Sequence, residues 1–408
     1  MVDDRIRVAM LHGPGRPDAD GVSDYVAHLV EALDDVGVEV TPVPVRPDGD
    51  RGGWRAATVR AARRVRELAP DVVHVQFAPS AYRFSGQPGL LPWRLPRRVP
   101  LVTTLHEYGW WACPGWLPGR LWSAAERARC WDRESGRLVP ASAAVIVTNP
   151  GHGDVVRART GRAPTHIPIA PNVADHVGAA TAGWRLRAEL GLPEGAPLLA
   201  FFGFVHPVKG LRHLVEALPD LRRDHPELRL LVVGGFTSQA LPEPQARAFR
   251  AELTGLARHC GVAEAVTFTG HLPAERVSAA LHAADVAVLP FTAGVSTKSG
   301  ALLAALAHGV PTAVTVPDPA DDELRRGGAV TVPDPADDEL RRGGAVAVIG
   351  RRRDSAAIAR TVGRLLADPV LRRRLAERGR AFAAAYSWPR VAAAHRDLYA
   401  RTLGRAGA

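Results

Sequence analysis

The sequence is poor in cysteine, in lysine and in long apolar runs. The shortage of cysteine and the lack of long apolar runs each argue against a class of protein. Its 408 residues include three cysteines, an odd number without metal-ligand spacing, which argues against a disulfide framework or a zinc site. No apolar run approaches the roughly 20 residues that a membrane-spanning helix needs. The amino-terminal MVDDRIRVAML has two aspartates near its start and enters a strand-like pattern at once, which predicts a cytoplasmic protein.

Basic residues exceed acidic ones, but this excess does not indicate a nucleic-acid-binding protein. The formal net charge is +10. The basic residues are almost all arginines on expected helix surfaces, without interleaved aromatic side chains. We therefore expect no nucleic-acid partner. The charge can still favour anionic substrates or lipid headgroups through long-range attraction, so peripheral membrane contact stays open.

Short apolar runs alternate with amphipathic stretches along the whole chain, which predicts an α/β fold of parallel, doubly wound sheets. In the first half, strands are expected near residues 6–11, 39–43, 71–77, 101–105 and 144–148. In the second half, they are expected near 198–203, 228–233, 266–268, 286–290 and 311–316. A proline-containing connection at 166–176 separates the halves. The expected divisions are an amino-terminal domain over 1–172, a second domain over 173–386 and a terminal helix over 387–408.

One segment is duplicated. TVPDPADDELRRGGAV occurs at 315–330 and again at 331–346 without a difference. Two copies cannot build a repeat array, so we interpret the pair as a tandem duplication. One copy is enough to form the connection that the compact fold needs. The chain is then expected to return to the sheet near residues 345–349, with the other copy as a surface loop outside any ligand site.

The chain has only two lysines, Lys209 and Lys298, and both fall in loops between an expected strand and an expected helix. Small or polar residues accompany them: Gly203, Ser296, Ser299 and Gly300. Backbone N–H groups at a helix N-terminus, with an ammonium group beside them, bind phosphate well. For either loop alone, an ordinary turn with an exposed lysine is an equal interpretation. Their coincidence in one domain favours a shared diphosphate.

The first domain offers further candidates beyond the carboxyl ends of its strands, where doubly wound sheets bind ligands. The ranges concerned are 12–24, 76–82, 106–111 and 149–152. Gly21 would let the first loop approach a ligand closely. Aromatic faces in this sequence can stack on a sugar or an apolar molecule, although packing within the protein is an equal interpretation. The polar and aromatic residues after the strand at 101–105 are His106, Glu107, Tyr108, Trp110 and Trp111.

Over essentially its full length, the chain resembles the GT-B-fold glycosyltransferases of the large retaining family four. The stretches that carry the resemblance are, in order, GVSDYVAHLVEAL, DVVHVQF, TLHEYG, GFVHPVKGLRHLVEAL, RLLVVGGF, VTFTGHLP, ADVAVLPF, AALAHGVPTAV and YSWPRVAAAH. The resemblance implies two Rossmann-like domains facing across a cleft and a last helix that crosses back to the first domain. It also implies a nucleotide-sugar donor held mainly by the second domain, an acceptor held by the first, and retention of configuration.

Carried over residue by residue, the resemblance is partial. It implies that Lys209 contacts the donor phosphate and that His106 reaches the donor sugar as the catalytic residue. The arginine usual after the strand-end glycine is Phe204 here, and Lys298 could replace it as counter-charge. The family's two glutamates, eight positions apart, fall on Ser296 and Ala304.

These inferences predict a transferase that moves a hexose-like unit from a UDP- or GDP-sugar to a small-molecule, glycan or lipid acceptor, in a natural-product or cell-surface glycan pathway. No DxD-type carboxylate pair follows an apolar strand, so no metal and no cofactor beyond the donor co-substrate is expected. Phe204 and Ala304 favour one alternative, a sugar-nucleotide-binding homologue without activity. The other alternative is a nucleotide-sugar epimerase, and the absence of a glutamate at Ser296 argues against it.

Overall fold

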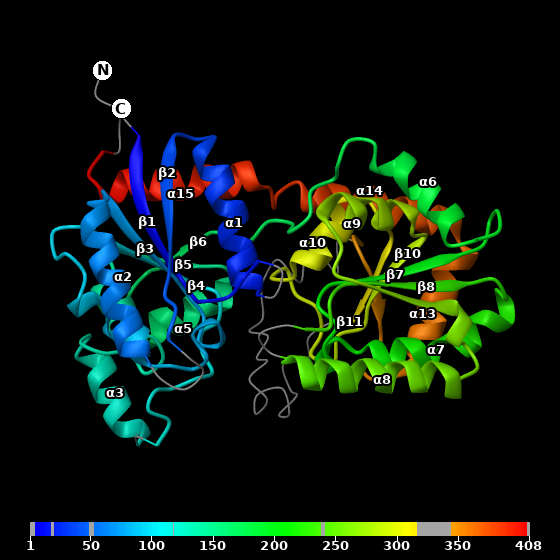
Figure 1. Ribbon diagram of the computed structural model, residues 1–408, viewed down its shortest axis with the longest axis horizontal. Coiled ribbons are helices and arrows are strands. Elements are labelled where there is room, and N and C mark those ends of the chain that lie inside the picture. The colour runs from blue at the N-terminus through cyan, green and yellow to red at the C-terminus, as the bar shows by residue number, and fades with distance from the viewer. Residues whose placement is uncertain are drawn as a thin grey trace. The chain divides into compact units, whose positions relative to one another are not determined.

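The computed structural model describes residues 5–17, 20–48, 53–116, 118–237, 241–315 and 344–405. These residues form two compact units (Figure 1). The amino-terminal unit runs to Ile169 and also takes in the chain from Trp388 onward, and the carboxy-terminal unit covers the chain between Ala170 and Ser387. The sequence placed these divisions after residues 172 and 386. No helix of the described residues is both long and apolar enough to cross a bilayer.

A parallel six-stranded sheet in the order β2-β1-β3-β4-β5-β6 forms the centre of the amino-terminal unit. Its strands are β1 (Ile6–His12), β2 (Val38–Pro44), β3 (Val72–Phe77), β4 (Leu101–Leu105), β5 (Ala144–Val147) and β6 (Thr165–His166). Its helices are α1 (Gly21–Asp34), α2 (Trp54–Leu68), α3 (Gly119–Arg127), α4 (Leu138–Ala141), α5 (Pro150–Thr160) and α15 (Trp388–Thr402), with 3-10 turns η1 (Ser80–Tyr82) and η2 (Gln87–Trp93). Every residue of β3 is buried, as expected for a central parallel strand that helices cover on both faces.

The carboxy-terminal unit contains a second parallel six-stranded sheet, in the order β12-β11-β10-β7-β8-β9. Its strands are β7 (Leu198–Phe202), β8 (Arg229–Val233), β9 (Val266–Gly270), β10 (Val286–Leu289), β11 (Thr312–Thr315) and β12 (Ala347–Ile349). Its helices are α6 (Ala179–Glu189), α7 (Leu211–Asp224), α8 (Glu243–His259), α9 (Ala274–Ala283), α10 (Gly300–Ala307), α13 (Ser355–Ala367) and α14 (Pro369–Ala383), with 3-10 turns η3 (Pro207–Lys209) and η4 (Ala263–Ala265).

Alternating side chains of these strands fill two apolar layers. Leu199 and Phe201 belong to the layer shared with α7, α8 and α13, whereas Leu198 and Phe202 belong to the layer shared with α6 and α9. Figure 1 shows α7 and α8 on one side of this sheet and α9 on the other. The predicted fold class, two doubly wound α/β units, is confirmed.

The terminal helix α15 belongs to the amino-terminal unit, although it follows the whole carboxy-terminal unit in the sequence. Figure 1 shows this red helix within the blue amino-terminal unit, where it contacts α1. The ring of Trp388 stacks on His28, with centroids 5.3 Å apart, and lies 5.4 Å from the ring of Tyr25. Both partners are on α1, so α15 is anchored by side-chain packing within this unit.

The duplicated segment lies almost entirely outside the described residues. Its first residue, Thr315, ends β11, and its last residues Ala345 and Val346 are buried in the core. The chain then enters β12, which pairs in parallel with β11. The expected return to the sheet is confirmed, while the prediction that one copy forms a surface loop falls on residues that the structure does not describe.

Deletion of residues 331–346 should leave the stability of the protein nearly unchanged. Because the two copies are identical, the shortened chain keeps Thr315 before the connection, and Ala329 and Val330 take the buried places of Ala345 and Val346. Halving the length of a flexible connection changes its closure entropy by only about 0.6 kcal/mol. Thermal unfolding of the two proteins measures this. A loss of cooperative unfolding in the shortened protein would show that both copies are structural.

Candidate functional site

The carboxy-terminal sheet changes its strand order between β7 and β10, and the two lysine-containing loops follow these two strands. β8 and β9 extend the sheet on the side of β7, and β11 and β12 extend it on the side of β10. Ligands of doubly wound sheets bind beyond the carboxyl ends of the strands at such a switch point. The topology therefore brings the loops at 203–210 and 290–300 to the place where a ligand is expected.

Backbone contacts hold these two loops against each other. The carbonyl of Val208 accepts hydrogen bonds from the amide of Thr292 at 2.9 Å and from its hydroxyl at 3.1 Å. Gly210 has a φ of +70°, and a Cβ at this position would lie 2.0 Å from the carbonyl oxygen of Pro290. No other residue can occupy this place without moving one loop away from the other.

Lys209 lies half-buried where the loops meet. Its Nζ is 3.7 Å from the centroid of the Phe291 ring, a favourable cation–π distance. Within the described part of the chain, no carboxylate forms an ion pair with it. Burial lowers the pKa of Lys209 from 10.5 to about 8. The ammonium group is thus charged at neutral pH, partly desolvated, and available to an anionic ligand.

Hydrogen bonds to the end of β11 shape the second loop. The amide of Val295 donates to the carbonyl of Thr315 at 2.7 Å, and the Thr315 hydroxyl donates to the carbonyl of Phe291 at 2.6 Å. Ser299 is the N-cap of α10 and accepts a hydrogen bond from the amide of Leu302 at 3.2 Å. The loop therefore ends in an ordered helix N-terminus, whose first amides suit an anion.

The other predicted residues of this unit lie on the same two loops. Lys298 is half-buried, and its amide donates to the hydroxyl of Ser296 at 3.4 Å. Gly300 packs closely on Asn172, since an added Cβ would lie 3.2 Å from that side chain. Gly203 directly follows β7 and has a φ of +123°. The structure joins the loops that carry both lysines, and a shared diphosphate stays a prediction.

In the amino-terminal unit, His106 follows the last residue of β4 and is held by a buried glutamine. Its amide donates to the carbonyl of Phe77 at 2.9 Å, and its Nε2 lies 2.8 Å from Oε1 of Gln76. A ring nitrogen that faces an amide oxygen carries a hydrogen, so the neutral ring is the Nε2–H tautomer. The ring also meets Tyr25 edge-on, with centroids 4.9 Å apart.

A buried polar chain continues from Gln76 to the terminal helix α15. The amide nitrogen of Gln76 lies 3.4 Å from Nε2 of His74, which also faces the hydroxyl of Thr104 at 2.8 Å. On its other side, Nδ1 of His74 lies 2.7 Å from the hydroxyl of Tyr399. Burial lowers the pKa of His74 well below its usual value, so this ring is neutral. The chain orients the Gln76 amide with its oxygen towards His106.

Sequence reasoning included Gln76 among residues at a strand end but missed His74 and Tyr399. The available signal was the alternation of His74 and Gln76 with valines in DVVHVQF. Polar side chains inside a central strand need buried partners, and here a distant helix supplies one of them.

Two of the acceptor-side candidates have structural partners. Tyr108 is 1% exposed, and its hydroxyl donates to Asp132 at 2.7 Å. Its ring presents almost no surface to a ligand, and an acceptor-side role for it stays a prediction. Glu107 accepts hydrogen bonds from the hydroxyl of Ser80 at 2.7 Å and from its amide at 3.3 Å. The carboxylate of Glu107 therefore orders the turn after β3.

The other candidates of this unit lie closer to its surface. Trp110 and Trp111 pack on Phe84, with ring centroids 5.7 and 6.2 Å apart, and Phe84 is 49% exposed. Gly21 is the first residue of α1, and a Cβ there would meet nothing within 4 Å. The space beside Gly21 is consistent with a close ligand approach, which stays a prediction.

Comparison with known proteins agrees with this arrangement. The family model of glycosyl transferases group 1 matches residues 183–382, and that of the glycosyl transferase 4-like domain matches residues 1–172. A D-inositol 3-phosphate glycosyltransferase from Xylanimonas cellulosilytica is 31% identical over 98% of this chain and 96% of its own. The chain belongs to the group 1 glycosyltransferases.

The transferase shares its GT-B fold with solved structures of the same kind. Sucrose-phosphate synthase from Thermosynechococcus elongatus superposes with a TM-score of 0.69 at 21% identity, over 99% of this chain and all of its own. The Anabaena protein Alr3699/HepE, solved in complex with UDP and glucose, gives a TM-score of 0.67 at 15% identity, over 97% and 100% of the two chains. The predicted family and enzyme class are confirmed.

Two of the three positions where the transferase departs from the family resemblance are buried. Ala304 is fully buried on α10 among the apolar side chains that α6 and α9 cover. Ser296 is 7% exposed, so its hydroxyl lies near the loop backbone. Phe204 is half-buried after Gly203. Among the described residues of these loops, the positive side chains are therefore Lys209 and Lys298.

Replacing Gln76 by Glu should hold His106 in its imidazolium form to higher pH. The substitution keeps the shape of the side chain but places a carboxylate 2.8 Å from Nε2, and an opposite charge at this distance favours the protonated ring. An NMR titration of the His106 ring protons measures the change. Gln87→Glu on η2 is the matched control. If His106 titrates equally in the wild type, Gln76→Glu and the control, the side chain at position 76 does not control the protonation of the His106 ring.

Proposed function

We propose that the transferase moves a hexose-like unit from an NDP-sugar to an acceptor, with retention of configuration and without a metal ion at the diphosphate. The observation that carries this proposal is the joining of the two lysine loops at the switch point of the carboxy-terminal sheet. The complex of the Anabaena structure with UDP and glucose supports a UDP-sugar as the first donor to test, with a GDP-sugar second.

The positive groups of this unit would stabilise the departing nucleoside diphosphate. Lys209 and Lys298 would supply counter-charge, and the first amides of α10 would donate to phosphate oxygens. These groups are ordered by the loop contacts before the ligand binds. Charge that develops on the leaving group would therefore be stabilised without reorganisation of the protein.

His106 would act on the donor sugar from the amino-terminal unit. Gln76 holds its Nε2–H, so the neutral ring has its lone pair on Nδ1. Through this nitrogen, the ring would accept a hydrogen bond from a sugar hydroxyl and orient the transferred group. Gln76 would then be a positioning residue rather than a catalytic one.

A phosphorylated polyol is the first acceptor class to test. Its support is the 31% identity with a protein named D-inositol 3-phosphate glycosyltransferase. Trp110 and Trp111 on the same unit could stack on a ring of the acceptor. Glycans and lipids are the other acceptor classes to test. Contact of the protein with a membrane surface is a separate property to measure.

A panel of nucleotide sugars, each with and without inositol 3-phosphate, tests the proposed reaction. Transfer predicts that free nucleoside diphosphate is released and that the product keeps the anomeric configuration of the donor. Activity that survives exhaustive chelation supports independence from metal at the donor site. An epimerised donor, or binding without turnover over the full panel of acceptors, would contradict the proposal.

Replacing Lys209 or Lys298 by Ala should weaken UDP binding by about 1–3 kcal/mol, the usual loss for a charge-assisted contact. The wild-type affinity should also fall as the pH rises above about 8, because the Lys209 ammonium then loses its proton. The diphosphate of UDP stays fully ionised there, since its last phosphate pKa is near 6. Calorimetric titration between pH 7 and 9, below the range in which the uracil ring ionises, measures both effects.

Lys209→Arg is the control for the pH effect. Arginine keeps its charge throughout this range, so the variant should bind UDP with little dependence on pH above 8. An affinity that falls identically with pH in Lys209→Arg and the wild type would assign the titration to another group.

His106→Ala should lower kcat by at least about tenfold and leave the affinity for UDP within about twofold. The ring is expected to contact the transferred sugar and not the nucleotide, so its loss removes transition-state contacts alone. Steady-state kinetics and UDP titration separate the two. Equal losses of turnover and of UDP affinity would mean that His106 is structural.

A further inference from the structure

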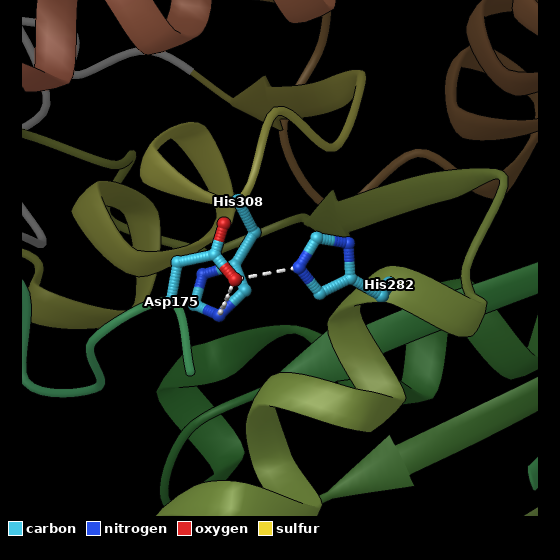
Figure 2. A group of neighbouring side chains, drawn as sticks. All are labelled: Asp175, His282 and His308. Carbon is cyan, nitrogen blue, oxygen red and sulfur yellow. Dashed lines mark hydrogen bonds and ion pairs between the residues drawn. The ribbon is translucent and has the colours of Figure 1, made fainter. Parts of the chain in front are cut away.

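Three side chains with metal-ligand chemistry converge in the carboxy-terminal unit, on a part of it that the donor loops do not include. Asp175 lies on the connection before α6, His282 lies on α9, and His308 is the C-cap of α10 (Figure 2). One ligand atom from each lies within 4.8 Å of the others. Figure 2 shows both histidine rings directed at the Asp175 carboxylate.

The tautomer of His308 is set by the end of its own helix. Its Nδ1 lies 2.7 Å from the carbonyl oxygen of Ala304, so Nδ1 carries the hydrogen and Nε2 presents a lone pair. A histidine whose other nitrogen donates to a carbonyl is the usual arrangement of a metal ligand, because that bond fixes the ring. His308 is 2% exposed, which fixes its position further.

The distances between the ligand atoms of these side chains fit a small transition metal if each atom moves by less than about 1 Å. Oδ1 of Asp175 lies 2.6 Å from Nε2 of His282 and 4.0 Å from Nε2 of His308. Tetrahedral ligands at about 2.0–2.1 Å from zinc lie roughly 3.3 Å from one another, between these two values. The Asp175 side chain is 43% exposed, so an ion and a completing water can reach it.

One hydroxyl competes for the His308 lone pair. Oγ of Ser278 lies 2.8 Å from Nε2 of His308 and accepts the amide hydrogen of His176 at 3.1 Å. Without an ion, the Ser278 hydroxyl donates to this nitrogen. An ion on this lone pair replaces the Ser278 hydrogen bond, and the oxygen of Ser278 must then turn aside about the Cα–Cβ bond.

We propose that Asp175, His282 and His308 form a binding site for a zinc-class divalent metal ion, which fastens the connection before α6 to α9 and α10. Two imidazole nitrogens and one carboxylate suit Zn²⁺, whereas Mg²⁺ and Ca²⁺ prefer oxygen ligands. The site and the Ser299 cap lie at opposite ends of α10, whose eight residues span about 12 Å. The ion is therefore structural, and the proposed metal-independent transfer is unaffected.

Zinc titration of the full-length, chelator-stripped protein tests the site. We expect one equivalent of Zn²⁺ to bind in calorimetry and to raise the unfolding temperature by a few degrees at saturation, because the ion binds the folded state. Mg²⁺ should do neither. Cobalt substitution should give the absorption of a tetrahedral Co²⁺ complex, which reports the ligand set without any assay of transfer.

Asp175→Asn and His282→Gln remove one ligand each from partly exposed positions and should weaken Zn²⁺ binding at least tenfold. His259→Gln, an exposed histidine at the end of α8, is the matched control and should bind like the wild type. Binding that is equal in all four proteins would overturn the proposal, as would no saturable binding by the wild type. If a variant fails to fold, the cobalt spectrum of the wild type still decides.

Discussion

The contact between the loops after β7 and β10 is the constraint on which the proposed donor site of this transferase depends. Parallel pairing makes β7 and β10 neighbours, and Gly210 then lets one loop lie directly on the carbonyl of Pro290. Thr292 adds two hydrogen bonds to the Val208 carbonyl. A Cβ at Gly210 would separate the loops, and Lys209 would lose its place over Phe291. The geometry of both loops thus depends on the lack of a Cβ at Gly210.

The amino-terminal unit orders its candidate catalytic residue by a different device. His106 lies at a strand end, but its orientation is set by amide and imidazole groups inside the sheet. The chain of contacts through Gln76 and His74 ends at Tyr399 on α15. Buried polar groups of this kind must all find partners, so they specify one arrangement more strictly than apolar packing does. This explains physically why the last helix belongs to the first unit.

Much of the fold could be predicted because hydrophobic periodicity is local. The strands at 101–105 and 286–290 were expected within a residue of their observed bounds, since short apolar runs mark both segments. The two-residue strand β6 was not predicted, because so short a segment has no period and its pairing with β5 comes from the neighbouring chain. The burial of Tyr108 was not predicted for a similar reason. An aromatic residue next to a strand looks the same in the sequence whether it faces solvent or the core.

The sequence by itself determined the doubly wound architecture, the family and the loops that carry both lysines, because each depends on residues close together along the chain. The tertiary structure alone decided the strand order that makes β7 and β10 neighbours, the partner of Gln76, and the meeting of Asp175 with His282 and His308. These contacts join residues that are far apart in the sequence. No local pattern encodes such distances, since they follow from how the strands pair and how the helices pack on them.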